Sequence, residues 1–161
     1  MNKGDPIPDV TVGDANGAVP LRSLVGGWAV VYFYPKDDTS GCTREAQDFT
    51  ALAPEFEAAG IQLVGLSKDD AASHDKFAAK HDLRVRLLSD EGGAACEAFG
   101  VWTEKSMYGR RYMGIERATF LFDAQGLLIE EWRKVKVPGH AQAVLATAKT
   151  GGDAGPGRPV R

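Results

Sequence analysis

Apolar runs along the chain predict the strands of a buried β-sheet. Residues 28–34 form an unbroken run of apolar, β-prone side chains that ends at Pro35, and residues 61–66 form a second run. A shorter run covers residues 86–88. Because the first two runs do not alternate with polar residues, we expect these strands to be buried.

Apolar residues at helical spacing separate the predicted strands. Between the first two strands this spacing is kept by Ala46, Phe49, Leu52, Ala53 and Phe56. Pro54 lies inside this pattern, so we expect it to kink or split the helix. Further helices are predicted over about residues 71–81, 94–99 and 140–149, with Phe77 facing inward in the first of them.

Two pairs of short strands are predicted to form hairpins. Residues 10–12 and 18–19 are apolar pieces on either side of an Asn-Gly turn signal at residues 16–17. Residues 117–123 and 127–134 predict two further strands joined by a short turn. Antiparallel hairpins are therefore expected near both ends of the chain.

The order of these elements predicts an α/β fold. Strand–helix alternation followed by a hairpin and a closing helix is typical of a mixed central β-sheet flanked by helices, here with an N-terminal β-hairpin. Residues 102–116 are rich in Gly, Tyr, Met and basic residues and are expected to be long and irregular. In such sheets the chemistry lies at the carboxyl ends of strands, which directs attention to residues 35–42.

Length and composition fit one globular domain. With 43% hydrophobic side chains in 161 residues, we expect one domain over residues 1–150 and a disordered Gly- and Pro-rich tail over residues 151–161. The net charge of −3 does not indicate a nucleic-acid partner. No apolar run approaches the ~18–20 residues of a membrane span, and residues 1–10 do not resemble a signal peptide.

The cysteines indicate a reducing compartment. Cys42 and Cys96 are the only two in the chain, too few for a disulfide scaffold. We therefore expect a cytoplasmic protein. No Cys-x-x-Cys pair is present, so each thiol has to be considered separately for chemistry.

The loop after the first buried strand places a cysteine at the start of a helix. Residues 34–45 read Tyr-Pro-Lys-Asp-Asp-Thr-Ser-Gly-Cys-Thr-Arg-Glu, which puts Cys42 in the first helical turn. The unpaired N–H groups and the positive end of the helix dipole stabilise an anion there, which favours the reactive thiolate. Thr39 can place its hydroxyl near the sulfur, and Pro35 offers an apolar wall. These neighbours favour chemistry over a role as a small buried side chain.

This loop resembles the active-site signature of the peroxiredoxins, Pro35-x-x-x-Thr39-x-x-Cys42. The longer string around it is similar to that of the bacterioferritin comigratory protein, or Q-type, subfamily. The likeness continues through residues 88–90, 96–102, 104–106 and 114–120. The resemblance implies a thioredoxin-like fold and a thiol peroxidase that reduces hydrogen peroxide and organic hydroperoxides through a cysteine sulfenic acid, without a cofactor.

The resemblance also implies roles for individual residues. Cys42 corresponds to the peroxidatic cysteine, and Thr39 to the hydroxyl that bonds the thiolate and the peroxide. Pro35 corresponds to the residue that shields the sulfur, and Arg117 to an arginine brought from a distant strand to the thiolate. Glu45 either orients Arg117 or is a surface residue favoured by the helix dipole.

Both positions at which relatives usually carry a resolving cysteine lack one here. The first is Gln47, five residues after Cys42, and the second falls within residues 77–79, Phe-Ala-Ala. Cys96, in the predicted helix over residues 94–99, is either a packing residue or a resolving cysteine. We therefore predict a one-cysteine mechanism in which thioredoxin, glutaredoxin or a small thiol reduces Cys42. A two-cysteine peroxidase that resolves through Cys96 remains the alternative.

A rival hypothesis is a redox-sensing interaction protein with a thioredoxin-like fold, in which oxidised Cys42 changes a binding surface. The resemblance favours a monomer, or at most a weak dimer. No metal site is expected, because His74, His81 and His140 are far apart in sequence and are predicted to be solvated at the surface. Trp102 is a candidate either for an apolar rim around the peroxide or for loop packing.

Overall fold

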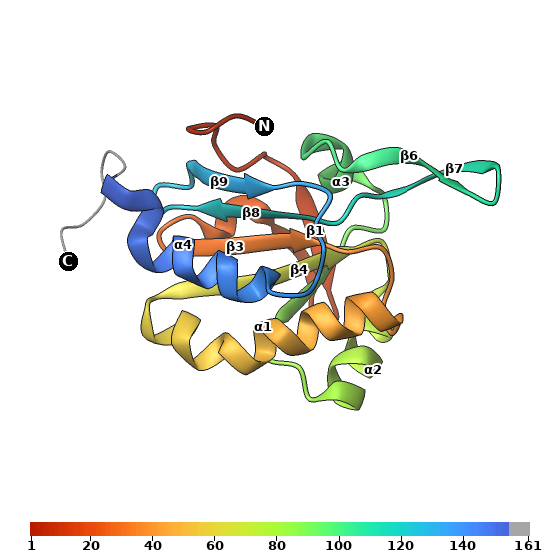
Figure 1. Ribbon diagram of the computed structural model, residues 1–161, viewed down its shortest axis with the longest axis horizontal. Coiled ribbons are helices and arrows are strands. Elements are labelled where there is room, and N and C mark those ends of the chain that lie inside the picture. Colours follow the sequence, from red (N-terminus) through yellow and green to blue (C-terminus); the bar gives the residue numbers. More distant parts are fainter. Residues whose placement is uncertain (155–161) are drawn as a thin grey trace.

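A mixed β-sheet of seven strands forms the centre of the molecule (Figure 1). The computed structural model describes residues 1–154. The strands of this sheet are β1 (Thr11–Asp14), β2 (Gly17–Pro20), β3 (Trp28–Phe33), β4 (Ile61–Ser67), β5 (Arg86–Ser89), β8 (Ala118–Phe122) and β9 (Leu128–Trp132). Their order is β2-β1-β5-β4-β3-β8-β9, with β3, β4 and β5 parallel and the other pairs antiparallel. The predicted mixed sheet and N-terminal hairpin are confirmed.

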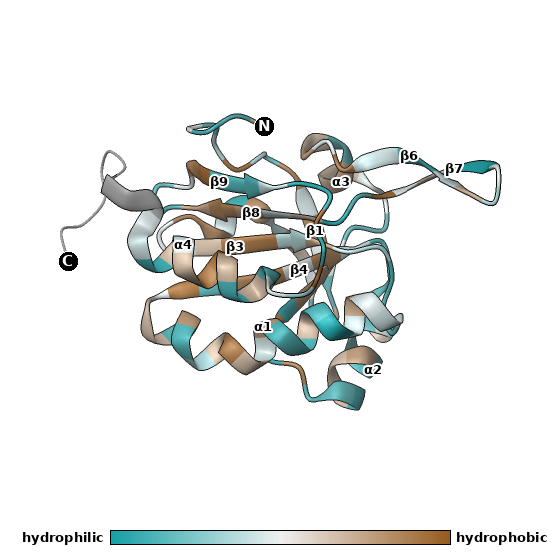
Figure 2. Ribbon diagram, viewed as in Figure 1, coloured by the Kyte–Doolittle hydropathy of each residue, from teal (hydrophilic) through white to brown (hydrophobic). Residues whose placement is uncertain are grey.

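Helices cover both faces of the sheet. They are the 3-10 helix η1 (Leu21–Leu24) and the α-helices α1 (Ser40–Ala58), α2 (Ala71–His81), α3 (Ala94–Ala98) and α4 (His140–Ala154). Because successive side chains of a strand point to opposite faces, β3 supplies two cores. Ala29, Val31 and Phe33 pack with residues of η1 and α3, whereas Val30 and Tyr32 pack with residues of α1, α2 and α4. The apolar strands in the middle of the sheet stand out in Figure 2.

Pro54 does not split the first long helix, which was one of the two predicted outcomes, a kink or a split. The helix α1 runs without interruption from Ser40 to Ala58, with Pro54 inside it. The side of the helix that carries Pro54 is exposed, whereas the neighbouring Ala53 and Phe56 are buried. At an exposed position the backbone carbonyl left without its N–H partner can bond to water, which reduces the cost of the proline.

Residues 102–116 are not irregular. They form a separate antiparallel hairpin of β6 (Trp102–Met107) and β7 (Arg110–Ile115), which projects from the body of the molecule (Figure 1). Its two-residue turn consists of Tyr108 at φ 52° and Gly109 at φ 77°. A turn with both central residues at positive φ favours hairpins, but Asn-Gly or Asp-Gly is its usual sequence. Because the sequence of this turn is Tyr-Gly, the usual sequence signal for the hairpin is absent here.

The closing helix is longer than predicted. The helix α4 continues to Ala154, so residues 151–154, which were expected to belong to a disordered tail, are helical. Gly151, at φ 61°, is buried. The rest of the predicted tail, residues 155–161, lies outside the described residues.

Candidate active site

Cys42 lies in the first turn of α1, where the chain enters the helix from the carboxyl end of β3. Thr39 is the N-terminal cap residue, with an extended backbone, and its carbonyl accepts a hydrogen bond from the N–H of Thr43 at 2.8 Å. The Cys42 side chain is buried, with 2% of its surface exposed. The unpaired N–H groups of this turn and the helix dipole stabilise negative charge on the sulfur.

Arg117, which directly precedes β8, reaches Cys42 across 75 residues of sequence. Its Nη2 donates a hydrogen bond to Cys42 Sγ at 3.4 Å, and its Nη1 donates one to Glu45 Oε1 at 2.7 Å. The approach depends on Gly41, because a Cβ at that position would lie 3.2 Å from Nη2. The fork of the guanidinium therefore holds the sulfur and the carboxylate together.

Glu45 is a buried carboxylate, not a surface residue. Only 1% of its side chain is exposed, and its Oε2 has no hydrogen-bond partner among the described residues. Burial raises the pKa of Glu45 to about 7, although the charge of Arg117 opposes this rise. Burial alone would lower the pKa of Arg117, but Glu45 and Cys42 raise it above its usual value. Glu45 thus occupies the position of an orienting partner for Arg117.

Thr39 and Pro35 belong to the segment that leads into α1, and among the described residues neither makes a side-chain hydrogen bond to the sulfur. The Oγ1 of Thr39 donates to the backbone carbonyl of Lys36 at 2.9 Å, and its side chain is exposed. Pro35 is also exposed and lines a pocket of about 360 Å³. Trp102 lines the same pocket. The hydroxyl therefore has to rotate away from Lys36 to reach a peroxide bound at Cys42.

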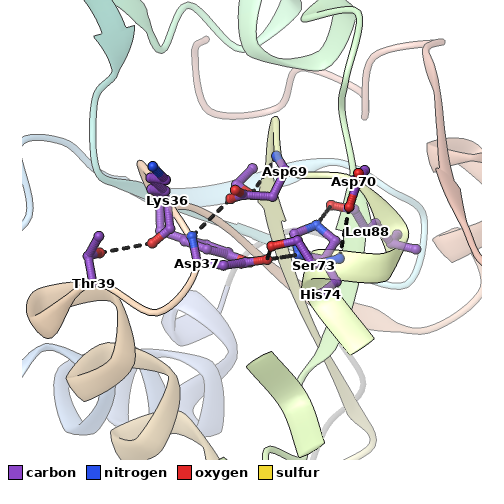
Figure 3. Close-up of polar contacts among 10 residues, drawn as sticks. Lys36, Asp37, Thr39, Asp69, Asp70, Ser73, His74 and Leu88 are labelled. Atoms are coloured by element: carbon purple, nitrogen blue, oxygen red, sulfur yellow. Dashed lines mark hydrogen bonds and ion pairs between the residues drawn. The ribbon is translucent and has the colours of Figure 1, made fainter. Parts of the chain in front are cut away.

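A buried polar cluster anchors the loop that precedes α1 (Figure 3). His74 Nδ1 lies 2.7 Å from Asp37 Oδ2, and His74 Nε2 lies 3.1 Å from the carbonyl oxygen of Leu88. Tyr34 Oη and Ser73 Oγ donate to the same carboxylate at 2.6 and 2.8 Å. Both ring nitrogens of His74 lie within hydrogen-bond distance of oxygen atoms, so the ring links the Asp37 carboxylate to the backbone at Leu88.

The charges of this cluster support one another. Burial raises the pKa of Asp37, but hydrogen bonds from His74, Tyr34 and Ser73 outweigh this effect and hold the pKa below its ordinary value. Beside it, the exposed Asp38 pairs with Lys80. The loop that precedes Cys42 is thus tied to α2 by the buried Asp37–His74 pair and by the exposed pairs of Asp38 with Lys80 and His81.

The prediction that all three histidines are solvated at the surface is wrong for two of them. His74 is 3% exposed and His140 is 7% exposed. His140 Nε2 lies 2.7 Å from Thr119 Oγ1, and burial, together with the charge of Arg117, lowers the pKa of His140 to about 4. His74 lies three residues before Phe77, on the same face of α2, and that spacing is the signal that could have revealed its burial.

Cys96 is fully buried in α3, on the opposite face of the sheet from Cys42. It packs in the core that contains Phe33 and Phe99, whereas Cys42 belongs to the core beneath α1. The carboxylate of Asp90 accepts hydrogen bonds from the N–H groups of Ala95 and Cys96. Burial raises the pKa of the Cys96 thiol, and Asp90 raises it further, so the reactive thiolate is disfavoured.

Within residues 1–154 no group of three or more His, Cys, Asp or Glu side chains is arranged to hold a metal ion. Among the same residues, none of the helices has the length and apolar character needed to cross a membrane.

Comparisons with known sequences agree with this site. The model of the AhpC/TSA family matches residues 3–130. Peroxiredoxin Bcp of Xanthomonas campestris is 54% identical over 129 residues, which cover 80% of this chain and 81% of the relative. Peroxiredoxin Bcp of Bacillus subtilis is 46% identical over 147 residues, which cover 91% and 94% of the two chains.

Solved structures give the same result. One structure of Xanthomonas campestris peroxiredoxin Q is similar with a TM-score of 0.84 at 49% identity, covering 90% of this chain and 92% of that one. A ligand complex of the bacterioferritin comigratory protein of the same organism, described in connection with its alkyl peroxide reduction, has a TM-score of 0.86 at 45% identity. That match covers 94% of this chain and all of the other.

Fold, site and relatives together define a thiol peroxidase with a thioredoxin-like fold. The chain belongs to the AhpC/TSA family, and within it to the Bcp, or Q-type, peroxiredoxins. The resemblance noted in the sequence is therefore confirmed, as is the predicted fold class. Because these relatives are peroxiredoxins, they favour the enzyme hypothesis over the rival hypothesis of a redox-sensing interaction protein.

Proposed function

We propose that this peroxiredoxin reduces hydrogen peroxide and organic hydroperoxides by a one-cysteine mechanism, with Cys42 as the peroxidatic residue and an external thiol as the reductant. The observation that carries the proposal is the pairing of a buried sulfur at a helix N-terminus with Arg117 Nη2 at 3.4 Å. Thioredoxin, glutaredoxin and a small thiol are the candidate donors.

The geometry suits attack of a thiolate on a peroxide. The sulfur of Cys42 bonds to one peroxide oxygen while the other leaves as hydroxide or alkoxide, so negative charge moves from sulfur to the leaving oxygen. Arg117 and the N–H groups of the first helical turn are fixed donors near the place where that charge develops. A stabilised thiolate alone would not make the reaction fast, because nucleophilicity falls as the thiolate becomes more stable. The fixed donors supply the additional stabilisation of the transition state.

Two observations support resolution by an external thiol. Gln47 is exposed and occupies one of the usual resolving positions, while residues 77–79 of α2 hold no cysteine. Cys96 lies in a different core on the other face of the sheet. A disulfide requires Cα atoms within about 7 Å, so a Cys42–Cys96 bond would require local unwinding.

We further propose that one chain carries the complete site and acts as a monomer in the reducing cytoplasm. Cys42, Glu45 and Arg117 all come from the same chain, and a sulfenic acid needs a supply of reduced thiols.

Steady-state turnover of cysteine variants tests the proposal. We expect Cys42→Ser to abolish peroxide consumption, because Cys96, the other thiol of the chain, is fully buried and has a raised pKa. Cys96→Ser should keep most of the activity with each donor. Full activity of the Cys42 variant would contradict the assignment, and loss of turnover in a folded Cys96 variant would favour the two-cysteine mechanism.

A further inference from the structure

A pocket of about 360 Å³ opens beside the Cys42 site. Its lining includes Pro35, two lysines and two aromatic residues, namely Lys68, Lys105, Trp102 and Tyr112. The volume falls within the range of small-molecule sites, roughly 300–1,000 Å³. Pro35 belongs both to this pocket and to the loop that precedes Cys42, and the charges of Cys42 and Arg117 act on Lys105, so the pocket borders the Cys42 site.

The pocket is basic and has no acidic residue in its lining. The Nζ of Lys68 lies 4.1 Å from the centre of the Trp102 ring, a cation–π contact. The stem of Lys105 packs over Gly114, where an added Cβ would lie 3.2 Å from Lys105 Cδ. A larger residue at position 114 would therefore displace this lysine.

The ammonium group of Lys105 interacts electrostatically with the active site. Burial lowers the pKa of its ammonium group, Arg117 lowers it further, and the charge of Cys42 opposes this effect. Glu116 also opposes it. Lys105 is therefore close enough to the Cys42 site for its charge to interact with that of the sulfur.

A second pocket, between the loop that precedes Cys42 and α2, is acidic and not basic. It is lined by Asp37, Asp38 and Asp70 together with Lys76 and Lys80. An anion approaching the loop is therefore attracted to the hairpin side, where the pocket lining holds two lysines and no carboxylate, and not to the α2 side, where three carboxylates line the pocket.

We propose that the basic pocket binds the reductant, and that this reductant is a small thiol that carries carboxylates. The inference rests on the one-cysteine function proposed above, since only a thiol from solvent then reaches the sulfenic acid. Lys68 and Lys105 pair with the carboxylates, while Trp102 and Tyr112 contact the apolar parts of the molecule. The thiol is thereby held toward Cys42.

The reaction balances with two molecules of this thiol. The first thiolate attacks the Cys42 sulfenic acid, forming a mixed S–S bond and breaking the S–O bond, and hydroxide leaves to become water. The second thiolate attacks the ligand sulfur of the mixed disulfide, which releases the Cys42 thiolate and a small-molecule disulfide. Two thiols are oxidised for each peroxide reduced.

The test compares glutathione with its diethyl ester, which lacks both carboxylates and keeps the α-ammonium group, in the resolving step. The full chain is oxidised with one equivalent of hydrogen peroxide and mixed with either thiol at equal thiolate concentration. Quenched-flow intact mass then gives the rate of the Cys42 mixed disulfide. We expect glutathione to react about tenfold faster than the ester, which corresponds to about 1.4 kcal/mol. This is within reach of two partly exposed ion pairs.

The double variant Lys68→Met, Lys105→Met should bring the ratio of the two rates close to 1. The ratio cancels any change in the intrinsic reactivity of Cys42. The control variant Lys76→Met removes a lysine from the acidic pocket and should keep the ratio of the parent. A ratio near 1 in the parent, or an unchanged ratio in the double variant, would overturn the inference.

A binding measurement on the reduced protein provides an independent readout. S-methylglutathione keeps both carboxylates but cannot react, and we expect saturation-transfer NMR to detect its binding to the parent and not to the double variant. Binding that survives the double substitution would contradict the proposal that the lysines of this pocket bind the carboxylates. Failure of peroxide to form a sulfenic acid at Cys42 would instead overturn the proposed function, so the two failures are distinguishable.

Discussion

A single guanidinium connects the reacting sulfur to a buried carboxylate. Arg117 donates to Cys42 Sγ and to Glu45 Oε1, and Glu45 keeps its second oxygen unpaired among the described residues. A buried carboxylate is costly to ionise, so it is retained where its charge positions another group. In this site it fixes the direction of the arginine that serves the sulfur.

Removing Arg117 should slow the reaction with peroxide. We expect Arg117→Met to lower the second-order rate of peroxide reduction by about 10²-fold, because a fixed donor to the developing charge is lost. Arg117→Lys should keep only part of the parent rate, since an ammonium group lacks the fork that spans Cys42 and Glu45. Stopped-flow measurement of peroxide consumption gives the rate. Arg84→Met, which removes the exposed partner of Glu57, is the control and should leave the rate unchanged.

The raised pKa of Glu45 predicts a pH-dependent stability. The native state holds a proton up to a pKa of about 7, whereas the unfolded state loses it near 4.5. Stability from this group is therefore full below about pH 4.5, falls as the pH rises to about 7, and stays reduced above that.

Glu45→Gln should abolish this effect, since the amide does not ionise. Relative to the parent, the variant should be more stable at pH 8 than at pH 5 by an amount on the order of 3 kcal/mol. Urea unfolding at the two pH values measures it. Taking the difference between variant and parent cancels the titration of other groups such as His140. An equal difference at both pH values would contradict the raised pKa.

At the level of secondary structure, the start of α1 is held by α2. The Asp37–His74 pair is 2.7 Å long, and both side chains are 3% exposed. Asp38, next along the chain, makes exposed pairs with Lys80 and His81. A buried carboxylate left without its partners is costly, whereas an exposed one is not. The buried pair of Asp37 should therefore contribute more to the free energy of unfolding than the exposed pairs of Asp38.

Matched asparagine variants separate the two contributions. We expect Asp37→Asn to lower the free energy of unfolding by about 3 kcal/mol, because the buried carboxylate that bonds to Tyr34, Ser73 and His74 is replaced by an amide with one acceptor oxygen. Asp38→Asn should change it little, and asparagine also tolerates the positive φ of 58° at this position. Chemical denaturation at neutral pH compares them. Similar losses in both variants would contradict a special role of the buried pair.

The elements that the sequence predicts well are those with local signals. The helix α2 covers the predicted residues because Asp70 caps its start by accepting a hydrogen bond from the Ser73 N–H, and Asp82 ends it in the left-handed region. The hairpin of β6 and β7 was missed because most of its side chains are exposed, so no buried face gives it a periodic pattern. Its Tyr-Gly turn added no familiar signal.

At the scale of the whole molecule, the site depends on contacts that no local pattern contains. Cys42 and Arg117 are far apart in sequence, and only the resemblance to a family brought them together in advance. The loop chemistry around Cys42 could be predicted, because a helix that follows a strand fixes where its first turn lies. The burial of Glu45 depends on tertiary packing and could not.

The sheet also decides the relation between the two thiols. Cys42 and Cys96 pack on opposite faces of it, in separate cores. Under the proposed one-cysteine mechanism, no resolving cysteine lies on the face of Cys42, and we expect the sulfenic acid to persist until a thiol arrives from solvent. Mechanism type is therefore a property of the whole fold and not of the active-site loop alone.

Peptide mapping of the oxidised protein tests this central claim most directly. The chain is treated with one equivalent of hydrogen peroxide in the presence of dimedone, denatured in a thiol-blocking reagent and digested without reductant. We predict that dimedone labels Cys42 as a trapped sulfenic acid while Cys96 is recovered alkylated as a free thiol. A dominant Cys42–Cys96 disulfide peptide would contradict the one-cysteine mechanism.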